Sequence, residues 1–177
     1  VIGVLAALHE ARRSGRGQVV DAAIVDGVSH LLAGTHALLA AGSWADERGV
    51  NMLDGGAPFY QVYETADGEY VAVGALESRF YAELLDRLGV DEDPSRQHDR
   101  TTWPTLRARF AEVFATRTLA EWSTVFEDSD ACVAPVMSLR DAAKHPHIRA
   151  RGSITVHDEV LQPAPAPRFS RTRTSLG

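Results

Sequence analysis

Apolar residues recur at intervals of three and four in several parts of the chain, which is the spacing of one face of an α-helix. The pattern predicts helices over residues 1–13, 26–41, 78–88, 105–115, 119–126 and 139–143. The first helix ends at the turn Ser14-Gly15-Arg16-Gly17, because glycine adopts the left-handed conformation that terminates helices. Pro104 stands where proline commonly opens a helix.

Shorter apolar runs predict strands over residues 18–22, 59–65, 69–76, 132–136 and 153–156. Ala66-Asp67-Gly68 joins the second and third of these strands as a hairpin, since Asp-Gly favours tight β-turns. Residues 162–168 alternate proline with alanine, which favours an extended surface arm. The order of the elements predicts a mixed α/β fold, in which the hairpin and the three helices between Phe59 and Phe126 form one compact unit.

Composition limits the classes of protein to consider. The chain has 177 residues, of which 45% are hydrophobic and 24% charged, as in one globular domain or two small ones. A net charge of −6 argues against a protein that binds the phosphates of nucleic acid. No apolar run approaches the roughly 20 residues of a membrane-spanning helix. We therefore expect neither nucleic-acid nor membrane partners.

Residue usage indicates a source and a compartment. Cys132 is the single cysteine, which excludes an internal disulfide framework and a cysteine zinc cluster and fits a reducing compartment. Seventeen arginines against one lysine, with 26 alanines, indicate a GC-rich bacterial gene, so we expect a cytoplasmic bacterial protein. The chain opens at Val1 on an apolar helical run without a capping residue. We expect it to be a fragment that begins inside an element.

Glu77 is the first candidate for chemistry, because it follows an apolar strand and stands at the start of a helix. There the helix dipole and free backbone N–H groups favour an ionised carboxylate. Such a group can orient and stabilise a histidine, or act as a base. It can equally be a simple helix cap, and spacing alone favours that interpretation.

Other polar residues give weaker indications. His145-Pro146-His147 has only Asp141 as a nearby third ligand, so we predict no metal site. No serine stands in a G-x-S-x-G motif, and no nucleotide-binding glycine pattern occurs. Cys132, in an apolar strand, is expected to be an inert core thiol. The arginines at positions 96, 100, 107 and 109 have acidic neighbours, which indicates a solvated mixed-charge surface.

The predicted hairpin is rich in aromatic residues, namely Phe59, Tyr60, Tyr63 and Tyr70. Aromatic side chains favour strands, so packing within the sheet is the default interpretation. Exposed tyrosine faces could also line an apolar groove for a substrate.

Several motifs together carry a family resemblance. Gly55-Gly56-Ala57-Pro58-Phe59-Tyr60 is followed by Thr65-Ala66-Asp67-Gly68 and by Val71-Ala72-Val73-Gly74-Ala75-Leu76-Glu77. With residues 15–22, 130–136 and 164–170, they make the chain similar to the C-terminal half of the family III CoA-transferases, the CaiB/BaiF superfamily. The glutamate in Gly74-Ala75-Leu76-Glu77 makes it resemble the α-methylacyl-CoA racemase branch, because the transferase branches usually lack that glutamate.

The resemblance implies an interlocked homodimer whose subunits each have a large Rossmann-like domain and a small α+β domain. Residues 1–22 would then end the first part of the large domain, and residues 23–51 would form a linker. Residues 52–127 would form the small domain, and residues 128–177 would form a linker and the return to the large domain.

The resemblance also implies the chemistry. The family's racemases remove and return the α-proton of a 2-methyl-branched acyl-CoA thioester through an enolate, using a histidine and an aspartate as acid–base groups. Glu77 matches the carboxylate that pairs with this histidine. Four residues match the apolar wall along the acyl chain: Met52, Leu53, Tyr60 and Leu76. CoA would be part of the substrate, and no further cofactor is implied.

The family's catalytic histidine and aspartate fall before Val1, so the chain alone is not expected to racemise its substrate. Two alternatives stay open. One is a CoA-transferase of the same fold, which moves CoA between carboxylic acids. The other is a truncated subunit without catalytic activity, which predicts exposed apolar surface along residues 1–8 and 28–39.

Overall fold

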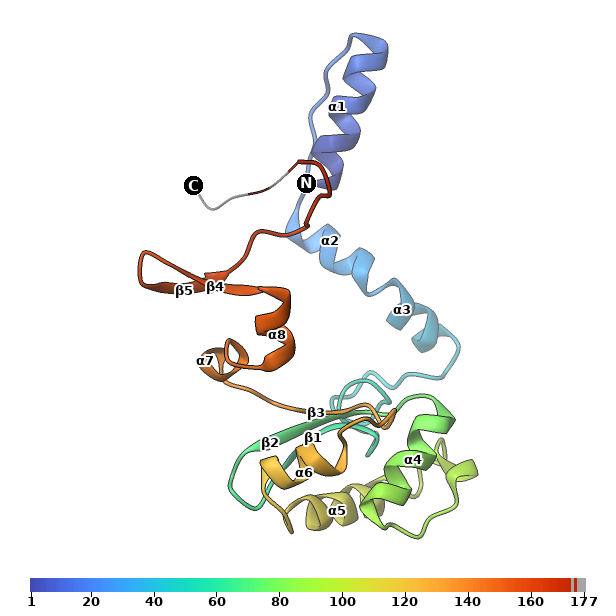
Figure 1. The fold of residues 1–177 in the computed structure, drawn as a ribbon. Coiled ribbons are helices and arrows are strands. Elements are labelled where there is room, and N and C mark those ends of the chain that lie inside the picture. The colour runs from blue at the N-terminus through green and yellow to red at the C-terminus, as the bar shows by residue number, and fades with distance from the viewer. Residues whose placement is uncertain (173, 175–177) are drawn as a thin grey trace. The chain divides into compact units, whose positions relative to one another are not determined.

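A computed structural model describes residues 1–172 and 174 of the chain. The chain divides into two compact units, Val1–Asn51 and Met52–Gly177 (Figure 1). The division falls between the predicted linker and the predicted small domain. The assignment of these segments to domains of a larger protein stays a prediction.

The first unit is helical. It contains α1 (Ile2–Ser14), α2 (Ile24–Leu31) and α3 (Ala33–Ala40). Gly15 ends α1 in the left-handed conformation, as predicted, with φ 71° and its N–H on the carbonyl of Ala11. The single helix predicted over residues 26–41 is instead two helices, because Leu32, with ψ 4°, leaves the α-helical region between them.

The strand predicted over residues 18–22 is wrong. These residues are exposed and lie outside any helix or strand. A strand needs a hydrogen-bonded neighbour, and no described segment pairs with this one. The three helices of this unit have no buried residue, and Ile2, Ile24 and Leu31 are each more than four-fifths exposed.

The second unit is built on a three-stranded antiparallel sheet in the order β1-β2-β3. Its strands are β1 (Tyr60–Glu64), β2 (Tyr70–Gly74) and β3 (Val133–Pro135). The predicted hairpin is confirmed: Tyr60 pairs with Gly74 and Glu64 with Tyr70, around a turn that contains Gly68 at φ 75°. β3, which lies far along the chain from the hairpin, pairs with the edge of β2 that β1 leaves open.

The helices predicted after the hairpin are also confirmed. They are α4 (Ser78–Leu88), α5 (Trp103–Phe114) and α6 (Leu119–Val125), with a 3-10 turn, η1 (Pro94–Arg96), between the first two. α5 contacts β1 and α6 contacts β3, so the helices cover one face of the sheet (Figure 1).

The core lies between this covered face and the helices. Tyr63 and Val71 face each other across β1 and β2 and are buried, whereas Tyr60, Val62 and Tyr70 on the opposite face are exposed. Aromatic rings fill the core; Tyr63 stacks on Phe114 with ring centroids 5.0 Å apart. The default interpretation of the aromatic hairpin therefore holds for Phe59 and Tyr63 and is wrong for Tyr60 and Tyr70.

The chain continues through α7 (Leu139–Ala142) and α8 (Pro146–Arg151) to a hairpin of β4 (Ile154–His157) and β5 (Val160–Pro163). The sequence pattern predicts α7 and β4 but misses α8, in which Pro146 occupies the first turn, where its missing N–H costs nothing. The extended arm predicted over residues 162–168 is wrong at its start, because Gln162 pairs with Thr155.

None of the described helices is long and apolar enough to cross a membrane.

Candidate active site

Glu77 occupies the N-cap position of α4, with φ −76° and ψ 139°, but its side chain makes no capping hydrogen bond. The side chain is exposed. Within the described part of the chain its carboxylate takes part in no hydrogen bond or ion pair. The simple cap interpretation therefore explains its position but not its side chain, which is free to meet a substrate or another acid–base group.

Backbone hydrogen bonds direct the chain from β2 into α4. The N–H of Ala75 donates to the carbonyl of Phe59 at 2.9 Å, and the N–H of Leu76 donates back to Gly74 at 2.9 Å. The carbonyl of Glu77 accepts the N–H groups of Phe80 and Tyr81 at 2.9 and 3.0 Å, which begins the helix. Glu77 is thus held by its main chain, while its side chain remains uncommitted.

Cys132 lies close enough to Glu77 for their charges to interact. It is exposed, at φ 52°, just before β3, and its carbonyl accepts the N–H of Gly74 at 2.9 Å. The prediction of a core thiol is wrong, because the pairing of β3 begins only at Val133. Partial desolvation, followed by the charge of Glu77, raises the pKa of the Cys132 thiol, so it stays protonated at neutral pH.

A groove of about 560 Å³ lies over the uncovered face of the sheet. Its lining includes Tyr60, Val62, Ala72, Gly74 and Cys132. Of the four residues predicted to form the apolar wall, Tyr60 lines this groove. Met52 and Leu76 are half-buried against the core, and Leu53 is exposed. The groove and Glu77 are linked along the chain, since Gly74 lies only three residues before Glu77.

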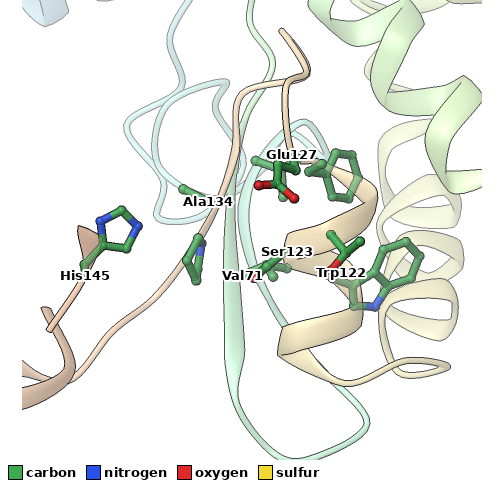
Figure 2. A pocket seen from close by; sticks show the side chains of 10 residues that line it. Val71, Trp122, Ser123, Glu127, Ala134 and His145 are labelled. Carbon is green, nitrogen blue, oxygen red and sulfur yellow. The ribbon is translucent and has the colours of Figure 1, made fainter. Parts of the chain in front are cut away.

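A second pocket, of about 410 Å³, gathers Ser123, Glu127 and His145 (Figure 2). These residue types suggest a hydrolase triad, but the hydrogen bonds of a triad are not formed. The Ser123 hydroxyl donates to the carbonyl of Leu119 at 2.8 Å, within α6. His145 Nδ1 is buried with no hydrogen-bond partner among the described residues. The Ser123 hydroxyl is therefore engaged by its own helix and not by His145.

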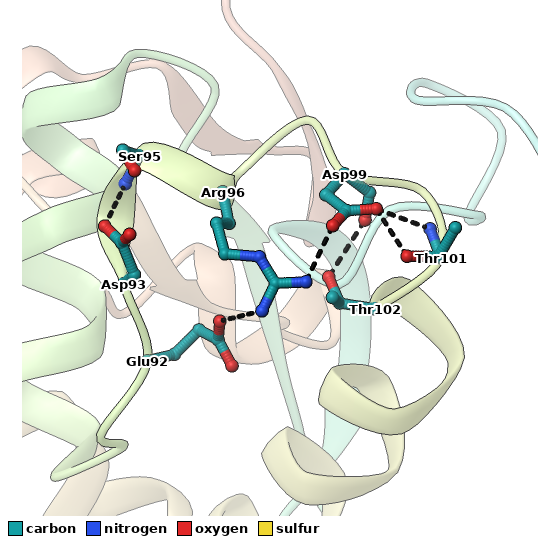
Figure 3. Close-up of polar contacts among 7 residues, drawn as sticks. All are labelled: Glu92, Asp93, Ser95, Arg96, Asp99, Thr101 and Thr102. Atoms are coloured by element: carbon teal, nitrogen blue, oxygen red, sulfur yellow. Dashed lines mark hydrogen bonds and ion pairs between the residues drawn. The ribbon is translucent and has the colours of Figure 1, made fainter.

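In the charged loop after α4, oppositely charged side chains pair with one another (Figure 3). Arg96 forms an ion pair with Asp99 at 2.7 Å and a longer one with Glu92 at 3.7 Å. The Thr101 hydroxyl and then Arg96 lower the pKa of Asp99 to about 2. Arg109 pairs with Glu112 at 3.2 Å. For Arg96 and Arg109 the prediction of a mixed-charge surface is confirmed.

No group of three or more potential metal-ligating side chains occurs among residues 1–172 and 174.

One polar residue near the Glu77 turn belongs to no motif that would identify it in the sequence. Gln97 is buried beneath the segment that leads to Glu77, and its side chain reaches the carbonyls of that segment. A polar residue in a charged loop gives no sequence signal of burial.

Two curated proteins illustrate the sequence similarity of this chain to known proteins. The chain is 47% identical over 173 residues to the α-methylacyl-CoA racemase of Mus musculus, covering 97% of this chain and 45% of the racemase. It is 30% identical over 183 residues to succinyl-CoA–D-citramalate CoA-transferase of Chloroflexus aurantiacus, with the same coverage of 97% and 45%. The chain spans about half the length of the curated relatives it matches.

The fold has a close match among solved structures. A hypothetical protein from Mycobacterium tuberculosis superposes with a TM-score of 0.71 at 18% identity, covering 99% of this chain and 47% of the other. The predicted mixed α/β fold, as about half of the family's structure, is confirmed. The family model for CoA-transferase family III matches residues 1–176. The chain therefore belongs to CoA-transferase family III.

Proposed function

We propose that this chain is the C-terminal half of an acyl-CoA racemase and that Glu77, in its small domain, is the catalytic carboxylate. The observation that carries the proposal is the uncommitted Glu77 side chain at the start of α4, in a chain 47% identical to a racemase. Identity to the CoA-transferase of Chloroflexus aurantiacus is lower, at 30%.

The reaction is the removal and return of a proton next to a thioester carbonyl. That proton is weakly acidic, so its removal needs a positioned base and stabilisation of the enolate oxygen. Racemisation also needs an acid–base group on each face of the planar enolate. Glu77 pairs with a histidine on one face, holds its tautomer and stabilises its cationic form. The histidine and the aspartate of the opposite face come from outside this chain.

An exposed carboxylate with no partner of its own suits this role, because no internal hydrogen bond must break before it binds the histidine. A carboxylate that capped its own helix would face the backbone instead.

The substrate proposed is a 2-methyl-branched acyl-CoA thioester. Its acyl chain runs over the apolar wall that includes Met52, Leu53, Tyr60 and Leu76. An apolar wall makes few polar demands, so it accepts acyl chains of different length. The proton transfers need acid–base groups only, so CoA enters as part of the substrate and no further cofactor is proposed. A homodimer and a bacterial cytoplasmic location stay predictions.

The test is α-deuterium wash-in. The intact gene product is incubated with a 2-methylacyl-CoA in heavy water, without an acceptor acid, and mass is followed. We expect uptake of one deuterium, and a loss of about 10²–10⁴-fold in rate for Glu77→Gln, which keeps the shape but not the charge. Glu112→Gln, which removes an exposed carboxylate from α5, is the matched control and keeps the wild-type rate.

The outcomes separate the candidates. No deuterium uptake, with CoA moving once an acceptor acid is added, would assign transferase activity, which the family also contains. Uptake that survives Glu77→Gln would keep the racemase and remove Glu77 from its mechanism. Exchange by the 177-residue chain alone would contradict the need for acid–base groups from outside it.

A further inference from the structure

Gln97 is a buried polar residue beneath the turn that carries Glu77. It follows η1, and only 2% of its surface is exposed. Its Nε2 group donates one hydrogen bond to the carbonyl of Ala75 at 3.0 Å and another to the carbonyl of Leu76 at 2.9 Å. These are the two carbonyls immediately before Glu77.

Gln97 is itself anchored in the core. The indole N–H of Trp103 donates to its carbonyl at 2.9 Å. Trp103 is buried and packs edge-on against Phe59, with ring centroids 5.7 Å apart. Phe59 in turn accepts the N–H of Ala75 through its carbonyl. The turn before Glu77 is therefore held from two sides, by the main chain of Phe59 and by the side chain of Gln97.

The two carbonyls need a donor of this kind. Residues 75–77 lie between β2 and α4, so neither a sheet ladder nor a helix supplies partners for both carbonyls. A buried carbonyl without a partner is unfavourable. Gln97 satisfies both with one amide, although its own Oε1 is buried without a hydrogen-bond partner among the described residues. The buried amide therefore serves as the hydrogen-bond donor to the Ala75 and Leu76 carbonyls.

We propose that Gln97 is a positioning residue for the reaction: its amide fixes the Ala75–Leu76 turn and thereby the place and direction of the Glu77 carboxylate. The inference rests on the proposed role of Glu77. A displacement of about 1 Å in a catalytic group can lower a rate by about 100-fold. A clamp on the residues next to Glu77 therefore acts on turnover more than on substrate affinity.

The first variant is Gln97→Met in the intact gene product, because methionine has a similar length and no donor. We expect the rate constant kcat for α-proton exchange to fall by about 10–100-fold, and KM to stay within about twofold. Leu88→Ala is the matched control. It truncates a core residue at the other end of α4, so it lowers stability without touching the turn, and it keeps the wild-type kcat where the protein is folded.

A double-mutant cycle separates positioning from general damage. In a Glu77→Gln background, Gln97→Met should lower the residual exchange rate by less than about twofold, because the group that it positions is already gone. Trp103→Phe keeps an aromatic ring against Phe59 and removes the N–H that holds Gln97, together with part of the indole. It should lower kcat in the same direction by a smaller factor, and it provides a second reading should Gln97→Met fold poorly.

A readout without activity covers the failure of the proposed function. Hydrogen–deuterium exchange of peptides that span residues 72–81 should accelerate in Gln97→Met and not in Leu88→Ala, as the N–H groups of Ala75 and Leu76 lose their fixed geometry.

Absence of α-proton exchange in the wild type would remove the proposed function and leave this readout as the test of the clamp. Three outcomes would overturn the inference. They are a wild-type kcat in Gln97→Met, an equal loss of kcat in Leu88→Ala, and an equal loss in both Glu77 backgrounds.

Discussion

Acidic side chains on the surface of the second unit fall into two kinds. Some accept hydrogen bonds from a neighbouring backbone or hydroxyl group, and others do not. Asp67 accepts the Thr65 hydroxyl at 2.5 Å and the N–H of Leu119 at 3.1 Å, which ties the β1–β2 turn to the start of α6. Asp99 accepts both the N–H and the hydroxyl of Thr101 (Figure 3). Among the described residues the Glu77 carboxylate has no hydrogen-bond or ion-pair partner, which it shares with Glu64 and Asp86; its position at the start of α4 distinguishes it from them.

The carboxylates that hold partners make stability depend on pH. Hydrogen bonds to the ionised form lower the pKa of Asp67, and lower that of Asp99 from 3.8 to about 2. A lowered pKa in the folded state stabilises the fold above pH 3.8, and this contribution is lost as pH falls toward 2.

We therefore expect the free energy of unfolding to be level above about pH 5 and to fall below about pH 4. Urea denaturation followed by the fluorescence of Trp103 and Trp122 between pH 2 and pH 6 measures this. Asp99→Asn should reduce the slope below pH 4. A slope unchanged by this substitution would mean that the Thr101 contacts do not stabilise the ionised form.

At the scale of the element, helix ends follow short local patterns. Thr118 begins α6 as a capping box: its hydroxyl accepts the N–H of Glu121 at 3.3 Å, and the Glu121 carboxylate accepts the N–H of Thr118 at 2.8 Å. The pattern Thr-x-x-Glu is visible in the sequence. The β4–β5 turn is not, since Asp158 and Glu159 adopt φ of 49° and 65° without the glycine that usually marks such turns.

Thr118→Ala should lower the free energy of unfolding by about 1 kcal/mol, because it removes one half of the capping box. Thr124→Ala, on the exposed side of the same helix, removes a hydroxyl that bonds only the carbonyl of Ala120 and should change stability by less than about 0.5 kcal/mol. Thermal or urea unfolding of the two variants gives the comparison. Equal losses would show that the box does not stabilise α6.

At the scale of the whole molecule, burial is uneven along the chain. Every buried hydrophobic residue of the described part lies between Ala57 and Ala131. Residues 1–8 and 28–39 expose Val1, Ile2, Leu31 and other apolar side chains, as the truncated-subunit alternative predicts. Stability from apolar burial therefore comes from the second unit.

A segment of residues 52–137 should unfold cooperatively by itself, because it contains this core together with β1, β2 and β3. A peptide of residues 1–51 should show no cooperative transition and should bind a hydrophobic dye. Circular dichroism during heating, with dye fluorescence, checks both. Cooperative unfolding of the 1–51 peptide would show that its helices stabilise each other without a covering surface.

Features that depend on near neighbours along the chain are predictable from the amino-acid sequence. Helical spacing, Asp67-Gly68, Pro104 and the Thr118–Glu121 pattern each act within a few residues, so the hairpin, α4, α5 and α6 could be predicted. The sequence also marked Glu77, through the strand before it and the helix after it. The strand predicted at residues 18–22 does not form, because the composition of a segment does not show whether another strand pairs with it.

Which side chains lack a partner, and which distant residues hold the turn before Glu77, depends on the packing of the folded chain. Cys132, which the sequence places in the core, is exposed in the structure because the pairing of β3 begins at Val133. Gln97 reaches Ala75 across 22 residues of sequence, and no local pattern contains that contact. The physical reason is common to both: burial and hydrogen bonding depend on segments that meet in space, whereas sequence patterns report only neighbours along the chain.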